Sequence, residues 1–169
     1  MAIAVVVALV AWLATRSDNG SSEPAEPEVG PPRIVAVDEL REVAATLGQP
    51  IYWAGPVPGK ELELNELGEG GVQLLYVPEG TGAGEGSPKS LTIGSYPLSD
   101  PAKALEGFAK RQGSIVHHAA DGREVVTSED TPTSVYFSSP ENSVQIEVYS
   151  PSAKRAMNLA LSGKVQPAG

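Results

Sequence analysis

The chain has 169 residues, a formal net charge of −9 at pH 7 and no cysteine. Without cysteine it forms no disulfide, no Cys-ligated zinc site and no thiol nucleophile. The acidic balance argues against nucleic acid and anionic lipid as partners, because both carry negative charge themselves.

The first segment in chain order is an uncharged apolar run over residues 2–14. A helix of this length rises only about 20 Å, whereas the hydrocarbon core of a membrane is roughly 30 Å thick. The run also has the size of a signal peptide, but no basic residue precedes it, and Trp12 makes cleavage after Ala14 unfavourable. Residues 17–32 are rich in Ser, Gly, Pro and Glu and predict a disordered acidic linker. We therefore expect an uncleaved transmembrane anchor at residues 1–16, with a cleaved signal as the alternative.

The orientation of this anchor follows from two opposing signals. Arg16 lies directly after the apolar run and favours a C-terminal side in the cytoplasm. Short N-terminal anchors with acidic, Pro-rich linkers usually present their domain outside the cell. We expect a single-pass protein of the cell membrane with an extracytoplasmic domain, and a cytoplasmic domain at the inner face is the alternative.

Residues 33–166 have the length of one domain, and three segments within it show the apolar spacing of amphipathic helices. We expect these helices over residues 38–48, 100–113 and 150–163. Asp38, Asp100 and Ser150 are the expected N-caps, and a glycine ends each helix. Proline follows the second and third caps, where its missing N–H has no cost.

The remaining segments alternate or contain β-branched and aromatic residues, which is typical of strands. Residues 60–78 predict a hairpin in which Leu62 and Leu64 share one face. Further strands are expected at residues 33–37, 50–55, 90–97, 114–118, 123–127, 134–138 and 144–149. The order of elements predicts the α+β class: an antiparallel sheet with about three helices packed on one face, preceded by an N-terminal transmembrane helix.

Two pairs of segments indicate an internal duplication. The stretch "IYWAGPVPGKELEL" resembles "VYFSSPENSVQIEV", and "SYPLSDPAKAL" resembles "VYSPSAKRAM". Each pair shares a tyrosine, small residues and a proline in similar order. Matches this short also arise by chance, so independent elements are the alternative.

No constellation of reactive residues stands out. The glycines in "EGTGAGEGSPK" precede a strand instead of a helix, which is the wrong context for a phosphate-binding loop. His117 and His118 are neighbours on a strand and point to opposite faces, so they do not share one metal. Glu61 and Glu63 share a face, as the two acids of a glycosidase do, but alternation produces this on any solvated strand. We expect no catalytic residue, no metal and no cofactor.

The two adjacent aromatic residues Tyr52 and Trp53 are the candidate binding residues. On a strand one of them faces the core and the other faces away. Aromatic side chains with a polar tip are enriched at interfaces. In a chain with few aromatic residues, a core position for Trp53 is the competing interpretation.

The stretches "VDELREVAATLGQPIYWAGP", "LTIGSYP", "PTSVYF" and "VQIEVYSPS" resemble uncharacterised membrane-anchored proteins of high-GC Gram-positive bacteria. The resemblance covers most of residues 35–165 and implies a bacterial envelope location and an α+β order of elements. It implies no activity, because none of these stretches is a catalytic signature. Proteins of this kind usually carry a longer N-terminal span with a positive flank, which this chain lacks.

The sequence therefore predicts a membrane-tethered extracytoplasmic domain without enzymatic activity, which binds an envelope protein or a cell-wall component. The alternative is a cell-envelope hydrolase whose acids and histidines converge only in three dimensions. A pocket that contains His117 or His118 with a carboxylate favours the hydrolase. An exposed aromatic or apolar patch on the order of several hundred Å² without such a pocket favours the binding module.

Overall fold

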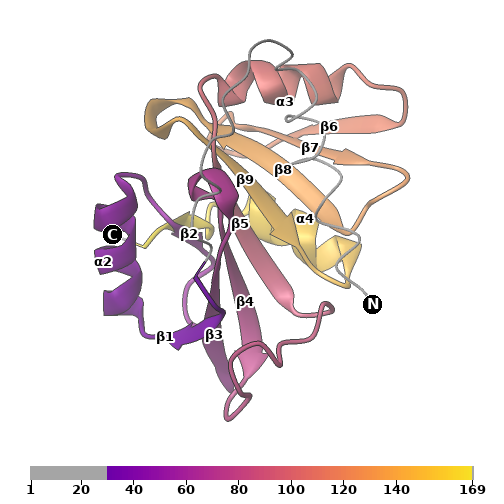
Figure 1. The fold of residues 1–169 in the computed structure, drawn as a ribbon. Helices are drawn as coiled ribbons and strands as arrows, with labels where there is room; N and C mark the ends of the chain where they lie inside the picture. Colours follow the sequence, from indigo (N-terminus) through magenta and orange to yellow (C-terminus); the bar gives the residue numbers. More distant parts are fainter. Residues whose placement is uncertain (1–29, 169) are drawn as a thin grey trace, which may run out of the picture.

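The computed structural model describes residues 30–168, which form an eight-stranded antiparallel sheet, a two-stranded sheet and three α-helices (Figure 1). The strands are β1 (Arg33–Val35), β2 (Tyr52–Trp53), β3 (Lys60–Glu66), β4 (Val72–Pro78), β5 (Leu91–Pro97), β6 (Ser114–His118), β7 (Glu124–Ser128), β8 (Ser134–Ser139), β9 (Val144–Tyr149) and β10 (Gln166–Pro167). The helices are α2 (Val37–Leu47), α3 (Pro101–Ala109) and α4 (Ala153–Leu161), with short 3-10 turns η1 (Gly68–Gly70) and η2 (Pro140–Asn142).

The large sheet has the strand order β1-β3-β4-β5-β9-β8-β7-β6, and all its neighbouring strands are antiparallel. Its two central strands, β5 and β9, come from different halves of the chain and pair in a register that places Ile93 opposite Val148. The N-terminal half of the domain therefore forms one side of the sheet and the C-terminal half forms the other.

One face of the sheet carries the main hydrophobic core. Side chains alternate between the two faces of a strand, and on this face they include Leu64, Leu74, Ile93, Ile146 and Phe137, all fully or almost fully buried. The buried residues of α2 and α4 belong to the same cluster, as do residues of β2. This face is thus closed by two helices and the small β2–β10 sheet.

The opposite face is covered by α3 over the C-terminal strands. Leu105 and Phe108 of α3 pack on Val126 and Tyr136, and the rings of Phe108 and Tyr136 meet edge to face with centroids 5.2 Å apart. The expectation that all helices lie on one face is therefore wrong. Both faces of β7 and β8 carry buried apolar side chains, Val125, Val135 and Phe137 on one face and Val126 and Tyr136 on the other, so each face of this part of the sheet needs a cover.

The fold is also richer in β-structure than the expected α+β sheet, because eight strands form one sheet and the three helices are short. The expected transmembrane helix at residues 1–16 and most of the expected linker at residues 17–32 lie outside the described residues. Within residues 30–168, no helix is long and apolar enough to cross a membrane.

The N-terminal ends of the helices show which of the expected N-caps form in the structure. The Asp100 side chain accepts a hydrogen bond from the Lys103 N–H, as expected for an N-cap. The expected caps at Asp38 and Ser150 are wrong: α2 begins one residue earlier, after Ala36, and Ser152 caps α4 by accepting from the Arg155 N–H.

The fold does not support an internal duplication. Of the first pair of matched segments, β2 lies in the small sheet beside β10, whereas β8 lies in the large sheet between β9 and β7. In the second pair, α3 and α4 follow the two central strands but cover opposite faces. The matched segments therefore occupy different surroundings.

Candidate functional site

The two candidate binding residues, Tyr52 and Trp53, lie on β2. The Tyr52 ring is buried, meets Phe137 edge to face at 6.4 Å, and its hydroxyl accepts a hydrogen bond from Asn142 Nδ2 at 3.2 Å. Its backbone N–H donates to Ser95 Oγ on β5 at 2.9 Å. Trp53 is half-buried and packs against the main core. Tyr52 therefore joins the small sheet to the large one, and a binding role for Trp53 stays a prediction.

The two histidines lie on β6, which forms one edge of the large sheet. His117 is paired with Val125 and His118 with Glu124, so the two imidazoles point to opposite faces as expected. His118 Nε2 is 3.7 Å from Glu124 Oε1, and both side chains are more than half exposed. Among residues 30–168 no group of three or more His, Cys, Asp or Glu side chains could hold a metal ion.

The glycine-rich loop after β4 folds back over β3. Glu63 Oε2 accepts a hydrogen bond from the Gly84 N–H at 2.9 Å, and Glu61 Oε2 accepts one from the Gly80 N–H at 3.1 Å. Glu63 is consequently buried, with 2% of its surface exposed, although the alternation predicted a solvated position. The loop thus uses its amides to bind the domain's own carboxylates.

A polar cluster occupies the centre of the sheet on the α3 face. Glu147 is 4% exposed and accepts hydrogen bonds from the hydroxyls of Tyr96 and Tyr136, each at 3.0 Å. Gln73 Nε2 donates to the Tyr96 hydroxyl at 3.0 Å. Burial raises the pKa of Glu147, and it also raises the pKa of both tyrosines. This cluster links β4, β5, β9 and β8.

Gly94 makes room for this cluster. It lies opposite Glu147 in the ladder, and a Cβ at this position would be 2.5 Å from the Tyr96 hydroxyl. The Tyr96 ring therefore lies directly over the Gly94 backbone, which brings its hydroxyl to Glu147. The sequence contains a signal for this contact, because a glycine in the middle of an otherwise regular strand often marks a point where another group lies close to the backbone.

The surface of α4 carries an open depression of about 380 Å³. The helix buries Ala156 and Ala160 against the sheet, so the other side of its amphipathic pattern faces outward. The residues that line the depression are Ser152, Lys154, Arg155, Asn158, Leu159, Ser162 and Lys164. We call these seven residues the α4 surface.

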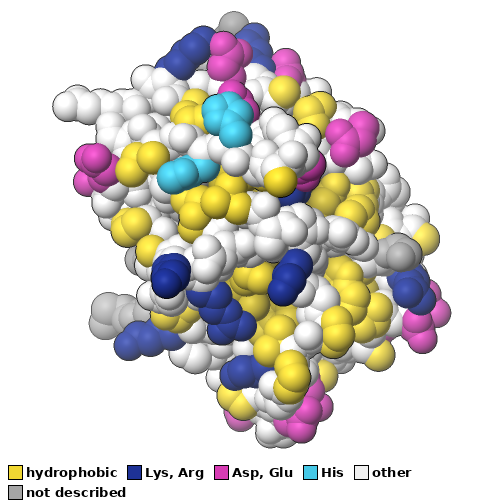
Figure 2. Space-filling model, turned by 180° about the vertical axis from the view of Figure 1, so that it is seen from behind, with side chains coloured by type: hydrophobic (Ala, Val, Ile, Leu, Met, Phe, Trp, Pro, Cys, Tyr) yellow, Lys and Arg dark blue, Asp and Glu magenta, His cyan; other side chains and the backbone are white. Residues whose placement is uncertain are grey.

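The α4 surface is basic although the domain is acidic. Lys154, Arg155 and Lys164 are exposed, and none of the ion pairs between described residues includes them. No Asp or Glu follows Glu147 in the chain. Viewed from behind, Lys and Arg side chains gather near the middle of the molecule, and Asp and Glu lie mostly toward its rim (Figure 2).

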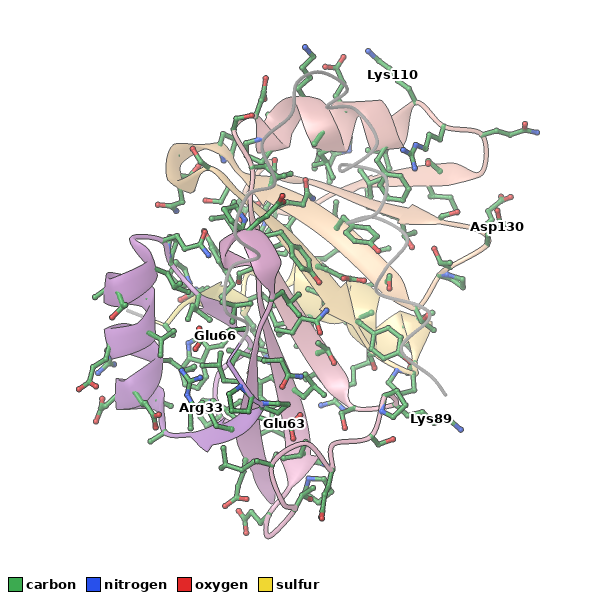
Figure 3. The ribbon with its side chains drawn as sticks, in the orientation of Figure 1. Arg33, Glu63, Glu66, Lys89, Lys110 and Asp130 are labelled. Atoms are coloured by element: carbon green, nitrogen blue, oxygen red, sulfur yellow. The ribbon has the colours of Figure 1, made fainter. Side chains whose placement is uncertain are left out.

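Several basic residues elsewhere in the domain form ion pairs with carboxylates, whereas Lys60, Lys89 and Lys103 are in none of the ion pairs between described residues. Arg33 lies 2.6 Å from Glu66 at the β1 edge of the sheet, where their side chains meet (Figure 3), and Lys110 pairs with Glu106 on α3. The positive charge of the α4 surface is thus concentrated and uncompensated. Sequence reasoning missed it because the net charge averages over the whole chain, whereas the segregation of charge in the last segment was a readable signal.

No protein-family model, no curated protein and no solved structure matches this chain. The chemistry of the α4 surface is therefore the main guide to function. It offers positive charges and neutral hydrogen-bonding groups, and it contains neither a histidine nor a carboxylate that could act as a base.

Proposed function

We propose that the chain is a non-enzymatic, membrane-tethered binding module on the outside of a bacterial cell, and that it binds an envelope component through the α4 surface. The observation that carries this proposal is the depression in which Lys154, Arg155 and Lys164 gather without an acidic neighbour. The tether and the outside location rest on the apolar run at residues 2–14 and on the resemblance to envelope proteins.

The charges of the α4 surface favour a ligand with more than one contact. A single exposed ion pair contributes about 0.2–1 kcal/mol, because water and salt screen it. Three cations together with Asn158 support a useful affinity only when a ligand contacts several of them at once. A component fixed in the cell wall meets this requirement, and tethering the domain beside it raises its effective concentration.

The binding module is favoured over the hydrolase because of how the titratable residues are distributed. His117 and His118 lie on the edge strand β6, and the buried Glu147 has both of its oxygens engaged by tyrosine hydroxyls. A hydrolase needs a base and an acid that face one bound substrate. The α4 surface provides contacts for a ligand and no such pair.

The proposal is tested in two steps with the full chain in bacterial cells. An epitope after Gly169 should be digested by protease added to intact cells, and the protein should fractionate with the membrane. Protection of the epitope until lysis, or release of the protein into the medium, contradicts the tethered outside domain.

The second step measures binding of the purified chain to isolated cell walls. The variant Lys154→Ala/Arg155→Ala/Lys164→Ala should lose this binding. The matched control Lys89→Ala/Lys103→Ala/Lys110→Ala removes the same charge from exposed lysines outside the α4 surface, two of which point outward at different ends of the domain (Figure 3). The control should bind like the wild type. Equal binding by all three proteins contradicts a role of the α4 surface.

A further inference from the structure

We infer that the ligand of the α4 surface is a linear polyanion whose charges are separated by neutral hydroxyl-bearing units, as in a polymer of polyol phosphates or sugar phosphates. This inference rests on the proposed function and names the chemical class of its ligand. Three features of the α4 surface support it: the spacing of its cations, the groups between them, and the charge of the surrounding domain.

The cations lie at two ends of the depression. Lys154 and Arg155 are in the first turn of α4, and Lys164 follows the last turn, after the cap at Ser162. Arg155 and Ser162 are two helical turns apart, which corresponds to roughly 10 Å along the axis. One small anion does not contact both ends, so the arrangement fits a chain with a negative charge at each end of the depression.

Neutral groups fill the space between the two ends. Asn158 is three residues from Arg155 and four from Lys154, and it therefore lies on the same side of the helix. Its exposed amide offers two donors and an acceptor. Leu159 adds an apolar contact beside it. Hydroxyl groups pair with such an amide, and the carbon skeleton of a polyol or sugar packs on such a leucine.

The acidic remainder of the domain limits the charge density of the ligand. Duplex DNA carries one negative charge per roughly 1.7 Å of its axis, so most of its charges would lie beyond the three cations, over a chain whose net charge is negative. A polymer with sparse charges places them only where the cations lie. Electrostatic repulsion therefore selects against nucleic acid while the α4 surface still attracts an anion.

The test titrates the full chain, held in neutral detergent, with four probes. These are poly(glycerol phosphate), the glycerol 1-phosphate monomer, the carboxylate polymer polygalacturonate and a single-stranded oligonucleotide. We expect poly(glycerol phosphate) to bind best, and its affinity should fall as salt is added. The triple variant Lys154→Ala/Arg155→Ala/Lys164→Ala should lose roughly tenfold or more in affinity. Asn158→Ala should lose about threefold because one hydrogen-bonding group is removed.

The control Lys89→Ala/Lys103→Ala/Lys110→Ala should bind the polymer like the wild type, and circular dichroism establishes that both triple variants are folded. Equal binding of the monomer and the polymer overturns the inference, as does tighter binding of polygalacturonate or of the oligonucleotide. If the chain binds cell walls through the α4 surface but does not bind poly(glycerol phosphate), the inference about the ligand class is wrong and the proposed function stands. If the chain binds neither cell walls nor the polymer, both the inference about the ligand class and the proposed function are wrong.

Discussion

Replacement of Glu147 tests whether the polar cluster in the middle of the sheet stabilises the fold. Glu147→Ala removes the acceptor for the hydroxyls of Tyr96 and Tyr136, and the Tyr136 ring stays buried under α3. A buried donor without a partner costs about 1–3 kcal/mol. Two such donors predict a loss of about 2–6 kcal/mol in the free energy of unfolding, which is a large part of the stability of a domain of this size.

Glu147→Gln is the matched variant, because it keeps the volume and one carbonyl acceptor. Tyrosine hydroxyls both donate and accept, so Tyr96 can accept from the new amide group. We expect this variant to lose no more than about 1 kcal/mol at neutral pH. Urea unfolding of the full chain, followed by circular dichroism, measures both differences.

The pH dependence of stability separates the charge of Glu147 from its packing. Burial raises its pKa above the ordinary value of 4.5. Between that value and the higher pKa of the folded domain, the native state holds a proton that the unfolded chain has lost. The contribution of Glu147 to the free energy of unfolding is therefore most favourable below pH 4.5, and it is lost as the pH rises through the pKa that Glu147 has in the folded domain.

The difference in stability between the wild type and Glu147→Gln should consequently change in this pH window and become constant above it. Other carboxyl groups contribute equally to both proteins and cancel. A difference that does not vary with pH refutes the reasoning about the buried charge. Equal stability of Glu147→Ala and Glu147→Gln refutes the reasoning about the two hydroxyls.

Three further substitutions test local parts of the fold. Asp100→Ala should lower the free energy of unfolding by about 1 kcal/mol because α3 loses its N-cap, and Asp100→Asn should restore the stability. The midpoint of thermal unfolding measures this difference, and an unchanged midpoint for Asp100→Ala contradicts a stabilising cap. Gly94→Ala should lower the free energy of unfolding by about 1–3 kcal/mol, since the new methyl group displaces the Tyr96 ring. If urea unfolding shows the same stability as the wild type, the ring moves aside without a loss of packing and the prediction is wrong. Glu63→Ala should speed proteolysis at Gly84, whose N–H loses its acceptor, and cleavage at the wild-type rate counts against this contact.

Much of the secondary structure was predictable because its signals are local. The hairpin over residues 60–78 follows from the alternation in its first strand and from the glycine turn that leads into an apolar second strand, and the Asp100–Pro101 pair marks the start of α3. The faces that the helices cover were not predictable in this way. The sequences of α3 and α4 both show a capped start and an apolar stripe, but the strand order and the apolar residues on both sides of β8 decide which face each helix covers.

The candidate sites were less predictable than the fold. The alternation in β9 predicts that Glu147 faces solvent, and only the tertiary structure reveals that Tyr96 and Tyr136 enclose it. Tyr52 and Trp53 attracted attention as aromatic residues, yet Tyr52 serves the core. In the sequence, Lys154 and Arg155 fit the polar side of an ordinary amphipathic helix. Their significance depends on Lys164, which the chain brings back beside the helix after its end.

The most direct test of the central claim is the position of ligand contacts on the domain, mapped by amide chemical shifts. The ¹⁵N-labelled full chain in neutral detergent is titrated with poly(glycerol phosphate) while the amide resonances are followed. The account predicts that the largest shifts fall within residues 152–164, and that the variant Lys154→Ala/Arg155→Ala/Lys164→Ala shows none of them. Shifts centred on Trp53, on β6 or on the glycine-rich loop, or no shifts at all, would contradict it.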